Sequence, residues 1–392
     1  MKQQAQLWQL PPLVQEEIIA AFQEDLSAKL SGAASSLSLL PSFLLPATGN
    51  ETGDFLALDF GGTNARMARI RLGGHGQHKV LKQVSRPLGV HLTAAGNAEN
   101  LFDFLAALAS DIVQPEEQLP LGHTFSFPCE QQNLHKAQLL RWSKEIATPG
   151  VIGQDVNQLL TAAFARAGLQ IQPVAIINDT IATLLAGTYL LPGTQIGSIL
   201  GTGHNTAYFE PTRHMLLNLE SGAFRSIPGN QFDAALDAAS LHPGEQPLEK
   251  RVSGRYLGEL VRLALVDEHP HCGLKQPYCV TPYHLAAWLH PGERCPFPLP
   301  PDVVGTARQL AQWVTLRSAR LAALTYVALF RHLGSSGPIA IDGSLYEHLP
   351  GYAAMVRVTL EEHGYRIPVR LLRGGSALGA ALAACAASKN LS

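Results

Sequence analysis

The sequence predicts an α/β protein with two domains. At 392 residues the chain is longer than one ordinary hydrophobic core serves. Short apolar runs that end in acidic, glycine or proline turns are typical of buried strands, and they occur at residues 55–60, 121–128, 174–177, 196–200 and 338–341. Apolar residues recur at helical spacing in other stretches, which predict helices at residues 13–30, 100–112, 181–191 and 303–333.

Composition excludes several functional classes. The net charge of −2 provides no basic footprint for nucleic acid or for an anionic membrane. No apolar run is long enough to span a bilayer, and the polar start Met1–Gln4 leads into an amphipathic helix rather than a signal peptide. The 5 cysteines, an odd number, do not form a disulfide framework. We therefore expect a cytoplasmic protein with no nucleic-acid or membrane partner.

The first predicted strand ends in an acid and turns through two glycines. Glycines let the backbone approach a phosphate closely with its N–H groups pointing inward. The hydroxyl, amide and guanidinium that follow are donors suited to phosphate oxygens, and Asp59 could hold Mg²⁺ through water. Any apolar strand before a Gly-Gly hairpin would look similar. The candidate phosphate-binding residues are Asp59, Gly61, Gly62, Thr63, Asn64 and Arg66.

A second turn has the same pattern. The strand at residues 196–200 leads into Gly201-Thr202-Gly203-His204-Asn205, and residues of high β-propensity follow. Two such hairpins in one chain suggest a nucleotide clamped between related halves. Neither is a P-loop, because no Gly-Lys-Ser/Thr follows a four-residue gap, and no protein-kinase triplet is present.

Two further polar residues leave alternatives open. Ser126 lies near the end of a predicted strand, where a solvated or backbone-bonded serine is the simpler interpretation. Lys144 follows Trp142 and Ser143, and a lysine is most often a solvated surface charge.

Asp179 lies at a junction between a predicted strand and a predicted helix. It could cap the helix or serve as a general base, and the two roles compete because a capping carboxylate is poorly placed to accept a substrate proton. If Thr180 supplies the cap, Asp179 is available for catalysis. The helix N-terminus favours the ionised carboxylate that a base needs.

Two glycine turns follow near the C-terminus. Asp342-Gly343-Ser344 ends an apolar strand, and Gly375-Ser376 opens an alanine-rich helix. Small residues there could let a flat ring such as adenine lie against the backbone, but close helix packing explains them equally well. The Cys/His-containing segment 269–295 is expected to be a proline-rich surface excursion, because the gap between Cys272 and Cys279 fits no common zinc spacing.

Taken together, these stretches resemble the hexokinase family, and the likeness covers nearly the whole chain in order. Residues 58–66 and 201–205 look like its two phosphate motifs, and residues 121–128 with 142–144 look like its sugar signature. Asn178-Asp179-Thr180 is similar to the segment that holds the catalytic base, and the turns at 342–344 and 375–376 to the adenosine side.

The resemblance implies an actin-like (ribonuclease H-like) ATPase fold with two lobes. Each lobe would be a mixed β-sheet flanked by helices, with a cleft between the lobes. The small lobe would comprise residues 53–175 and 376–392, and the large lobe residues 1–45 and 180–370. Hinges would fall near residues 46–52, 176–179 and 371–375.

The resemblance also implies roles for these residues. Asp179, Lys144 and Arg66 would be catalytic, with Asp179 taking the proton of the C6 hydroxyl of glucose as that oxygen attacks the γ-phosphorus of ATP. Arg66, Thr63, Thr202 and the Mg²⁺ held by ATP would neutralise the phosphoryl charge, and water would link this Mg²⁺ to Asp59 and Asp179. The implied sugar-binding residues are Ser126, Ser143, Lys144, Asn178, Asp179, Asn205, Glu220, Gln246 and Glu249. The implied nucleotide-binding residues are Asp59, Gly61, Gly62, Thr63, Asn64, Arg66, Gly201, Thr202, Gly203, Gly343, Ser344, Gly375 and Ser376.

Some positions depart from the family pattern. Ala65 and Arg225 replace an expected aromatic residue and a glycine, Ser143 replaces a threonine, and Ser221 replaces a tryptophan. None of these changes removes a reacting group, but they leave the preferred hexose open among glucose, mannose, fructose and glucosamine. A sugar sensor with little turnover is the rival function. The sequence leaves the choice between monomer and homodimer open.

Overall fold

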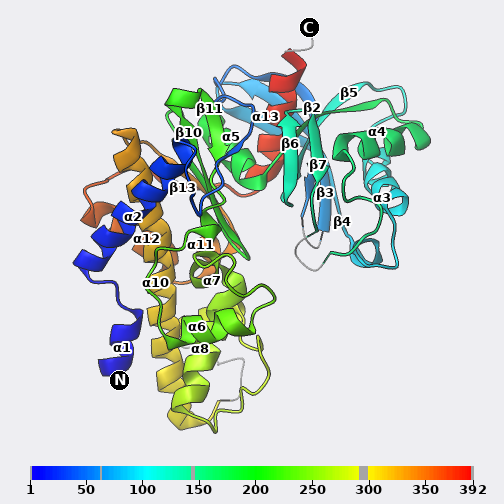
Figure 1. The fold of residues 1–392 in the computed structure, drawn as a ribbon. Coiled ribbons are helices and arrows are strands. Elements are labelled where there is room, and N and C mark those ends of the chain that lie inside the picture. The colour runs from blue at the N-terminus through cyan, green and yellow to red at the C-terminus, as the bar shows by residue number, and fades with distance from the viewer. Residues whose placement is uncertain (1, 62–63, 143–145, 291–298, 390–392) are drawn as a thin grey trace. The chain divides into compact units, whose positions relative to one another are not determined.

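The chain forms two compact units. The computed structural model describes residues 2–61, 64–142, 146–290 and 299–389 (Figure 1). Unit 1 comprises Met1–Leu39, Ser198–Thr206 and Leu219–Leu371, and unit 2 comprises Leu40–Gly197, Ala207–Asn218 and Leu372–Ser392. The lobe and hinge boundaries implied by the family resemblance stay a prediction.

Helices and strands both occur in the two halves of the chain. The α-helices are α1 Lys2–Trp8, α2 Pro12–Leu30, α3 Ala98–Ser110, α4 Val156–Arg166, α5 Asp179–Leu190, α6 Gln231–Ala239, α7 Glu249–Val252, α8 Gly254–Glu268, α9 Pro282–Leu289, α10 Pro301–Leu333, α11 Ser344–His348, α12 Tyr352–Glu362 and α13 Gly375–Lys389. The strands are β1 Leu40–Pro41, β2 Thr52–Phe60, β3 Asn64–Gly74, β4 Gln77–Pro87, β5 Leu119–Phe125, β6 Cys129–Asn133, β7 Lys136–Leu139, β8 Ile171–Ile177, β9 Ile196–Leu200, β10 His204–Glu210, β11 Met215–Asn218, β12 Ile339–Asp342 and β13 Val369–Leu371.

Unit 2 is built on a five-stranded mixed sheet of order β4-β3-β2-β5-β8. Strands β2, β3 and β4 form antiparallel neighbours, whereas β5 pairs in parallel with both β2 and β8. Because β2, β5 and β8 run in the same direction, their carboxyl ends lie at one edge of the sheet.

Both faces of this sheet are covered. Side chains of β2 that alternate along the strand, including Leu56 and Leu58, join a core with buried residues of α3 and α4. On the other face α13 packs against β2, β5 and α5. Gly122 of β5 and Gly379 of α13 allow this approach, since a Cβ on Gly122 would overlap the Ala380 carbonyl and one on Gly379 would overlap the Ala182 backbone.

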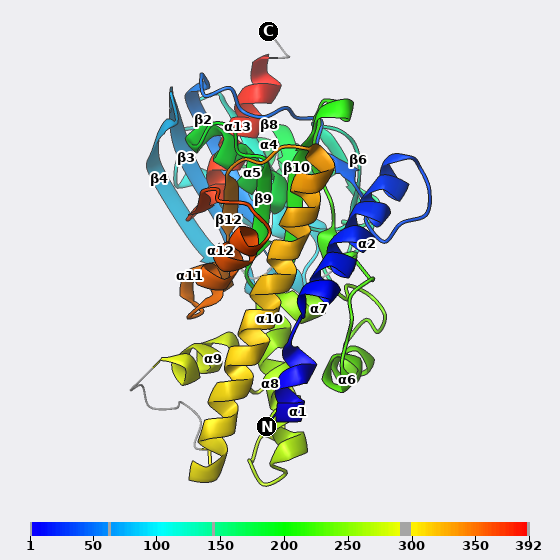
Figure 2. The same cartoon turned by 90° about the vertical axis from the view of Figure 1, so that its left-hand side faces the viewer.

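A second mixed sheet has the order β1-β11-β10-β9-β12-β13, and β6 pairs with β7 in a two-stranded sheet. In the six-stranded sheet β10 and β11 are antiparallel, whereas β12 and β13 are parallel. In unit 1 the long helix α10 lies along α2, α8 and α12 (Figure 2). Among the described residues, no helix is long and apolar enough to cross a membrane.

Most predicted elements are confirmed, with three informative differences. The stretch after the first turn is strand β3, although its apolar periodicity alone does not distinguish a strand from a helix. Strand β5 ends at Phe125, before Ser126 rather than at Pro128. The segment 269–295 is more than a surface excursion, because it contains α9, whose Leu285 and Trp288 are buried.

The tight contact between α13 and α5 predicts the effect of Gly379→Ala. The new methyl group would force backbone shifts in the core and lower the free energy of unfolding by about 1–3 kcal/mol. Gly305 is the matched control, since it lies inside α10 and a Cβ added there would meet no neighbouring atom within 4 Å. Gly305→Ala should stabilise the protein by about 0.5–1 kcal/mol. Urea unfolding measures both, and equal effects of the two substitutions would contradict this packing.

Candidate functional site

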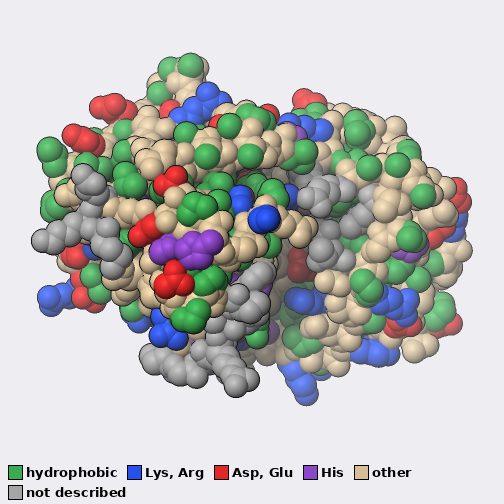
Figure 3. Space-filling view, turned by 90° about the horizontal axis from the view of Figure 1, so that it is seen from below, with side chains coloured by type: hydrophobic (Ala, Val, Ile, Leu, Met, Phe, Trp, Pro, Cys, Tyr) green, Lys and Arg blue, Asp and Glu red, His purple; other side chains and the backbone are tan. Residues whose placement is uncertain are grey.

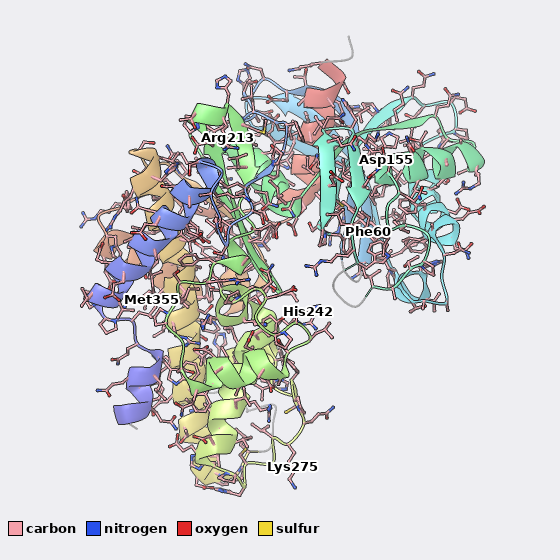
Figure 4. The ribbon with its side chains drawn as sticks, in the orientation of Figure 1. Phe60, Asp155, Arg213, His242, Lys275 and Met355 are labelled. Carbon is pink, nitrogen blue, oxygen red and sulfur yellow. The ribbon has the colours of Figure 1, made fainter. Side chains whose placement is uncertain are left out.

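Polar side chains gather at the carboxyl edge of β2, β5 and β8 in unit 2. Asp59 is the penultimate residue of β2, beside Phe60, which Figure 4 labels. Ser126 follows β5 directly, and Asn178 and Asp179 follow β8. All four residues are half-buried, and the sheet fixes the positions of their backbones. This edge can therefore present fixed carboxylates and hydroxyls to a ligand.

Neighbouring strands hold Asp59 in place. Thr124 of the adjacent strand donates its Oγ1–H to Asp59 Oδ1 at 2.6 Å. On the opposite side Arg66 pairs with Asp59 across β2 and β3, with 4.0 Å between Arg66 Nη1 and Asp59 Oδ2. The Arg66 Nε atom is buried but has no hydrogen-bond partner in the described part of the chain, and the side chain as a whole is 41% exposed. A guanidinium in this state can take an anionic ligand.

Asn178, rather than Asp179 or Thr180, caps helix α5. Asn178 Oδ1 accepts a hydrogen bond from Thr180 N at 2.8 Å, and Asp179 is the first residue of the helix. The backbone N–H of Asp179 donates to Ser126 Oγ at 3.1 Å, and Thr180 Oγ1 donates to Asp179 Oδ1 at 3.2 Å. The helix therefore does not need the Asp179 carboxylate as its cap. The backbone-bonded alternative for Ser126 holds, and its hydroxyl still has a proton to donate.

The first glycine turn is described only in part. Gly61 N donates to Asn64 O at 3.2 Å, which closes the turn between β2 and β3. Asn64 is exposed. The predicted residues Gly62, Thr63, Ser143 and Lys144 lie outside the described residues.

In unit 1 two predicted nucleotide turns lie side by side. Gly201 follows β9 and Gly343 follows β12, its neighbour in the sheet. A Cβ on Gly201 would lie 3.4 Å from the Gly343 Cα. Gly343 has a φ of +130°, and a Cβ there would overlap the Leu200 carbonyl, so the turn requires glycine. Thr202 and Ser344 are exposed beside these glycines.

The predicted sugar-binding residues of unit 1 surround Gly222. Asn205 Nδ2 donates to Glu220 Oε1 at 3.1 Å, and Glu249 Oε2 accepts from the backbone N–H of His204 at 3.0 Å. A Cβ on Gly222 would lie 2.5 Å from Gln246 Oε1 and 3.0 Å from Glu249 Cβ. The structure thus brings four half-buried side chains together at this point: Asn205, Glu220, Gln246 and Glu249.

Backbone geometry fixes two members of this group. Glu220 and Gln246 both adopt left-handed conformations, with φ values of +51° and +53°. Such conformations are uncommon outside glycine and cluster at functional sites.

The Gly201 turn is also joined to helix α8. The backbone N–H of Gly254 donates to Gly201 O at 2.8 Å, and that of Arg255 donates to Thr202 O at 3.2 Å. The last predicted nucleotide residues, Gly375 and Ser376, open helix α13 in unit 2. The close contacts of α13 described above support the packing interpretation of its small residues.

His204 is buried behind the second turn. Its Nδ1 lies 3.1 Å from Ile199 O and its Nε2 lies 3.4 Å from Ser221 Oγ. Burial lowers the pKa of His204 from 6.5 to about 4, so the imidazole is neutral at physiological pH. Ser221, which departs from the family pattern, is buried here and donates its backbone N–H to Asn205 Oδ1 at 3.2 Å.

Several supporting residues were not identified from the sequence. Thr124, Gly222 and Gly254 position the predicted residues, but each is informative only once strand pairing or loop contacts are known. Side chains alternate between the two faces of β5, so Thr124 lies on the same face as Gly122. This alternation is the sequence feature from which the position of Thr124 could have been predicted.

Comparison with known proteins agrees with this arrangement. Two family models described as hexokinase match residues 1–189 and residues 195–288 with 299–386. Hexokinase-2 of Oryza sativa subsp. japonica is 36% identical, over 97% of this chain and 89% of the relative. The hexokinase of Kluyveromyces lactis is 32% identical, over 95% of this chain and 89% of the relative.

Solved structures show the same likeness. A crystal structure of a hexokinase matches with a TM-score of 0.87 and 31% identity, over 99% of both chains. The hexokinase from Schistosoma mansoni, complexed with glucose, matches with a TM-score of 0.82 and 29% identity, over 97% of both chains. The protein is therefore a sugar kinase with the actin-like ATPase fold, as the resemblance implied. It belongs to the hexokinase family, whose members phosphorylate hexoses with ATP.

The buried histidines predict how stability depends on pH. Burial lowers the pKa values of His204 and His123 to about 4, below the value of 6.5 for an exposed histidine. Below pH 6.5 the unfolded chain takes up protons that the folded chain excludes, so stability is full above this pH and falls as the pH drops towards 4. Each histidine contributes a slope of up to about 1.4 kcal/mol per pH unit.

Urea unfolding of the His204→Gln variant between pH 7.5 and 5 measures this effect. The variant should lose less stability over this range than the wild type does. His123→Gln should have a similar effect, and the double variant should add the two changes because the sites are independent. A pH slope unchanged in both single variants would contradict the assignment.

Proposed function

We propose that the enzyme transfers the γ-phosphoryl group of ATP to O6 of glucose, with Asp179 as the general base. The main support for this proposal is that Asn178, and not Asp179, caps helix α5. Because Asn178 caps the helix, the half-buried carboxylate of Asp179 can accept a proton from a substrate hydroxyl. Asp179 is held at the sheet edge through the hydrogen bond from its backbone N–H to Ser126.

The two groups of polar side chains would bind one hexose. The family resemblance assigns Ser126, Asn178 and Asp179 to the hexose, together with the group around Gly222. A hexose hydroxyl both donates and accepts a hydrogen bond, so carboxylates and amides can saturate it in a fixed geometry. Such a site can reject a sugar that lacks a bonded hydroxyl by about 10⁴-fold, because its own polar groups are left unpaired. The family resemblance adds Ser143 and Lys144.

The glycine turns would bind the nucleotide. Backbone N–H groups of the turns at 61–64 and 201–203 suit phosphate oxygens, and the guanidinium of Arg66, whose side chain is 41% exposed, can donate hydrogen bonds to an anion. Gly343 and Ser344, with Gly375 and Ser376, would lie on the adenosine side. Asp59, a half-buried carboxylate at a strand end, fits the oxygen ligands that Mg²⁺ prefers, and it would contact the metal of MgATP through water. When bound, Mg²⁺ supplies charge neutralisation at the phosphates.

Water competes with the sugar as phosphoryl acceptor. We propose that sugar binding closes the two lobes, so that Asp179 meets the nucleotide only when the hexose is present. Binding energy from the ring hydroxyls would drive this closure. The cytoplasmic location and the choice between monomer and homodimer stay predictions.

A coupled assay with ATP, Mg²⁺ and a panel of hexoses tests the function. Glucose should give the highest kcat/KM, and phosphorylation should occur at O6. A higher kcat/KM for mannose, fructose or glucosamine would replace glucose as the preferred substrate. Sugar binding without turnover would contradict the proposal and favour a sensor.

Replacing the proposed base should affect chemistry but not folding. We expect Asp179→Ala to lower kcat by about 10²–10⁴-fold, the contribution of a general base, with far less effect on glucose binding. Since Asn178 supplies the cap, the variant should keep its free energy of unfolding within about 0.5 kcal/mol. Asn178→Ala is the matched control, which removes the cap and should cost about 1 kcal/mol. A folded Asp179→Ala variant with normal turnover would remove Asp179 from this role.

The side chains around Gly222 predict a separate effect on sugar affinity. A methyl group in Gly222→Ala would displace Gln246 and Glu249. Because the loss of one hydrogen bond to the sugar lowers its affinity about tenfold, KM for glucose should rise by at least about that factor. KM for ATP should change much less. Steady-state kinetics measure both, with Gly305→Ala as the control. A raised KM for ATP alone would place this group on the nucleotide side.

A further inference from the structure

A cluster of potential metal ligands lies in unit 1, outside the proposed active site. His269, His271 and Asp302 each offer a ligand atom, and these atoms all lie within 4.8 Å of one another. His269 follows the last residue of α8, and Asp302 lies in the first turn of α10. The view from below in Figure 3 shows histidine side chains beside acidic ones on the molecular surface. Lys275, in the loop after α8, is labelled in Figure 4.

The contacts within the cluster are short. His271 Nε2 lies 3.0 Å from Asp302 Oδ2, and His269 Nε2 lies 3.0 Å from Thr306 Oγ1. The two imidazole rings lie edge to face, with 5.7 Å between their centroids. His269 is half-buried, whereas His271 and Asp302 are exposed, so an ion can reach the site from solvent. Two hydrogen bonds that join α8 to α10 are the simpler explanation of this geometry, and a metal is the alternative to test.

Backbone rigidity favours the metal. Pro270 separates the two histidines, and Pro300 and Pro301 come directly before Asp302. Fixed φ angles beside all three ligands reduce the conformational entropy that ion binding would cost. Two imidazoles and one carboxylate match the ligands that Zn²⁺ and similar transition metals prefer, and they leave a coordination position for water. Thr306 can support His269 from outside the coordination shell.

We propose that His269, His271 and Asp302 bind one divalent transition-metal ion, with zinc chemistry, that joins the end of α8 to the start of α10. The site is independent of the proposed catalytic residues and of MgATP. Mg²⁺ is not expected to bind there, because it prefers oxygen ligands and retains its water. Among the described residues, the cluster contains no cysteine.

Calorimetric titration of the metal-free full-length protein with ZnCl₂ tests the proposal. The wild type should bind one equivalent that the His271→Gln/Asp302→Asn double variant loses, with affinity lowered more than about tenfold. His348→Gln is the matched control, since it removes an exposed histidine beside another carboxylate, with 3.6 Å between His348 Nε2 and Glu347 Oε2. All these proteins keep every cysteine, so binding to thiols cancels in the comparison. MgCl₂ should produce no equivalent that depends on His271.

A thermal measurement separates a bound ion from a simple hydrogen-bonded pair. Zn²⁺ should raise the Tm of the wild type and of His348→Gln, because a ligand that binds only the folded state stabilises it. It should leave the Tm of the double variant unchanged. Zinc binding that is equal in wild type and double variant, or absent from the wild type, would overturn the proposal. Circular dichroism of the double variant verifies that it folds.

Discussion

Parallel pairing of β2, β5 and β8 is the constraint on which the candidate site depends. It brings three chain segments that are far apart in sequence to one edge of a sheet, so that Asp59, Ser126 and Asp179 need no long loops to position them. The close packing of α13 against the other side of β5 fixes the sheet, which is why Gly122 and Gly379 carry no side chain. A loose helix there would let the carboxylates drift relative to a substrate.

At the start of α5, the side-chain amide of Asn178 caps the helix, so the carboxylate of Asp179 is not needed for capping. Asn178 Oδ1 accepts a hydrogen bond from the backbone N–H of Thr180, and Ser126 Oγ accepts one from the preceding backbone N–H, that of Asp179. The Asp179 carboxylate is therefore not needed as the helix cap, and its Oδ1 accepts a hydrogen bond from Thr180 Oγ1. A base that is positioned in this way keeps its acceptor capacity for a substrate proton.

In unit 1, glycines likewise allow segments of the chain to pack closely against one another. Gly343 lets the turn after β12 lie against the turn after β9, and Gly222 lets Gln246 and Glu249 approach the loop that carries Asn205. Left-handed backbone at Glu220 and Gln246 stores strain in this group, which the surrounding contacts must offset. The same short distances make the group sensitive to a single methyl group.

Much of the fold could be predicted from the sequence because strong apolar periodicity marks long elements such as α10 and α3. The candidate site residues were predicted from the order of glycine, acidic and amide motifs and from the family resemblance, and their roles stay a prediction. Contacts that depend on tertiary structure could not be predicted. The cap of α5 was open among neighbouring residues, and the approach of Asp302 to His269 and His271 joins segments with no sequence signal of proximity. The buried face of α9 was missed because prolines and cysteines around it suggested a loop.

A crystal structure with bound glucose is the most direct test of the central claim, that the carboxylate of Asp179 takes a proton from a hexose hydroxyl. The account predicts that the sugar O6 lies within hydrogen-bond distance of an Asp179 carboxylate oxygen, with Ser126 and Glu249 on other hydroxyls. Glucose bound away from Asp179, or with O6 directed to a different residue, would contradict it.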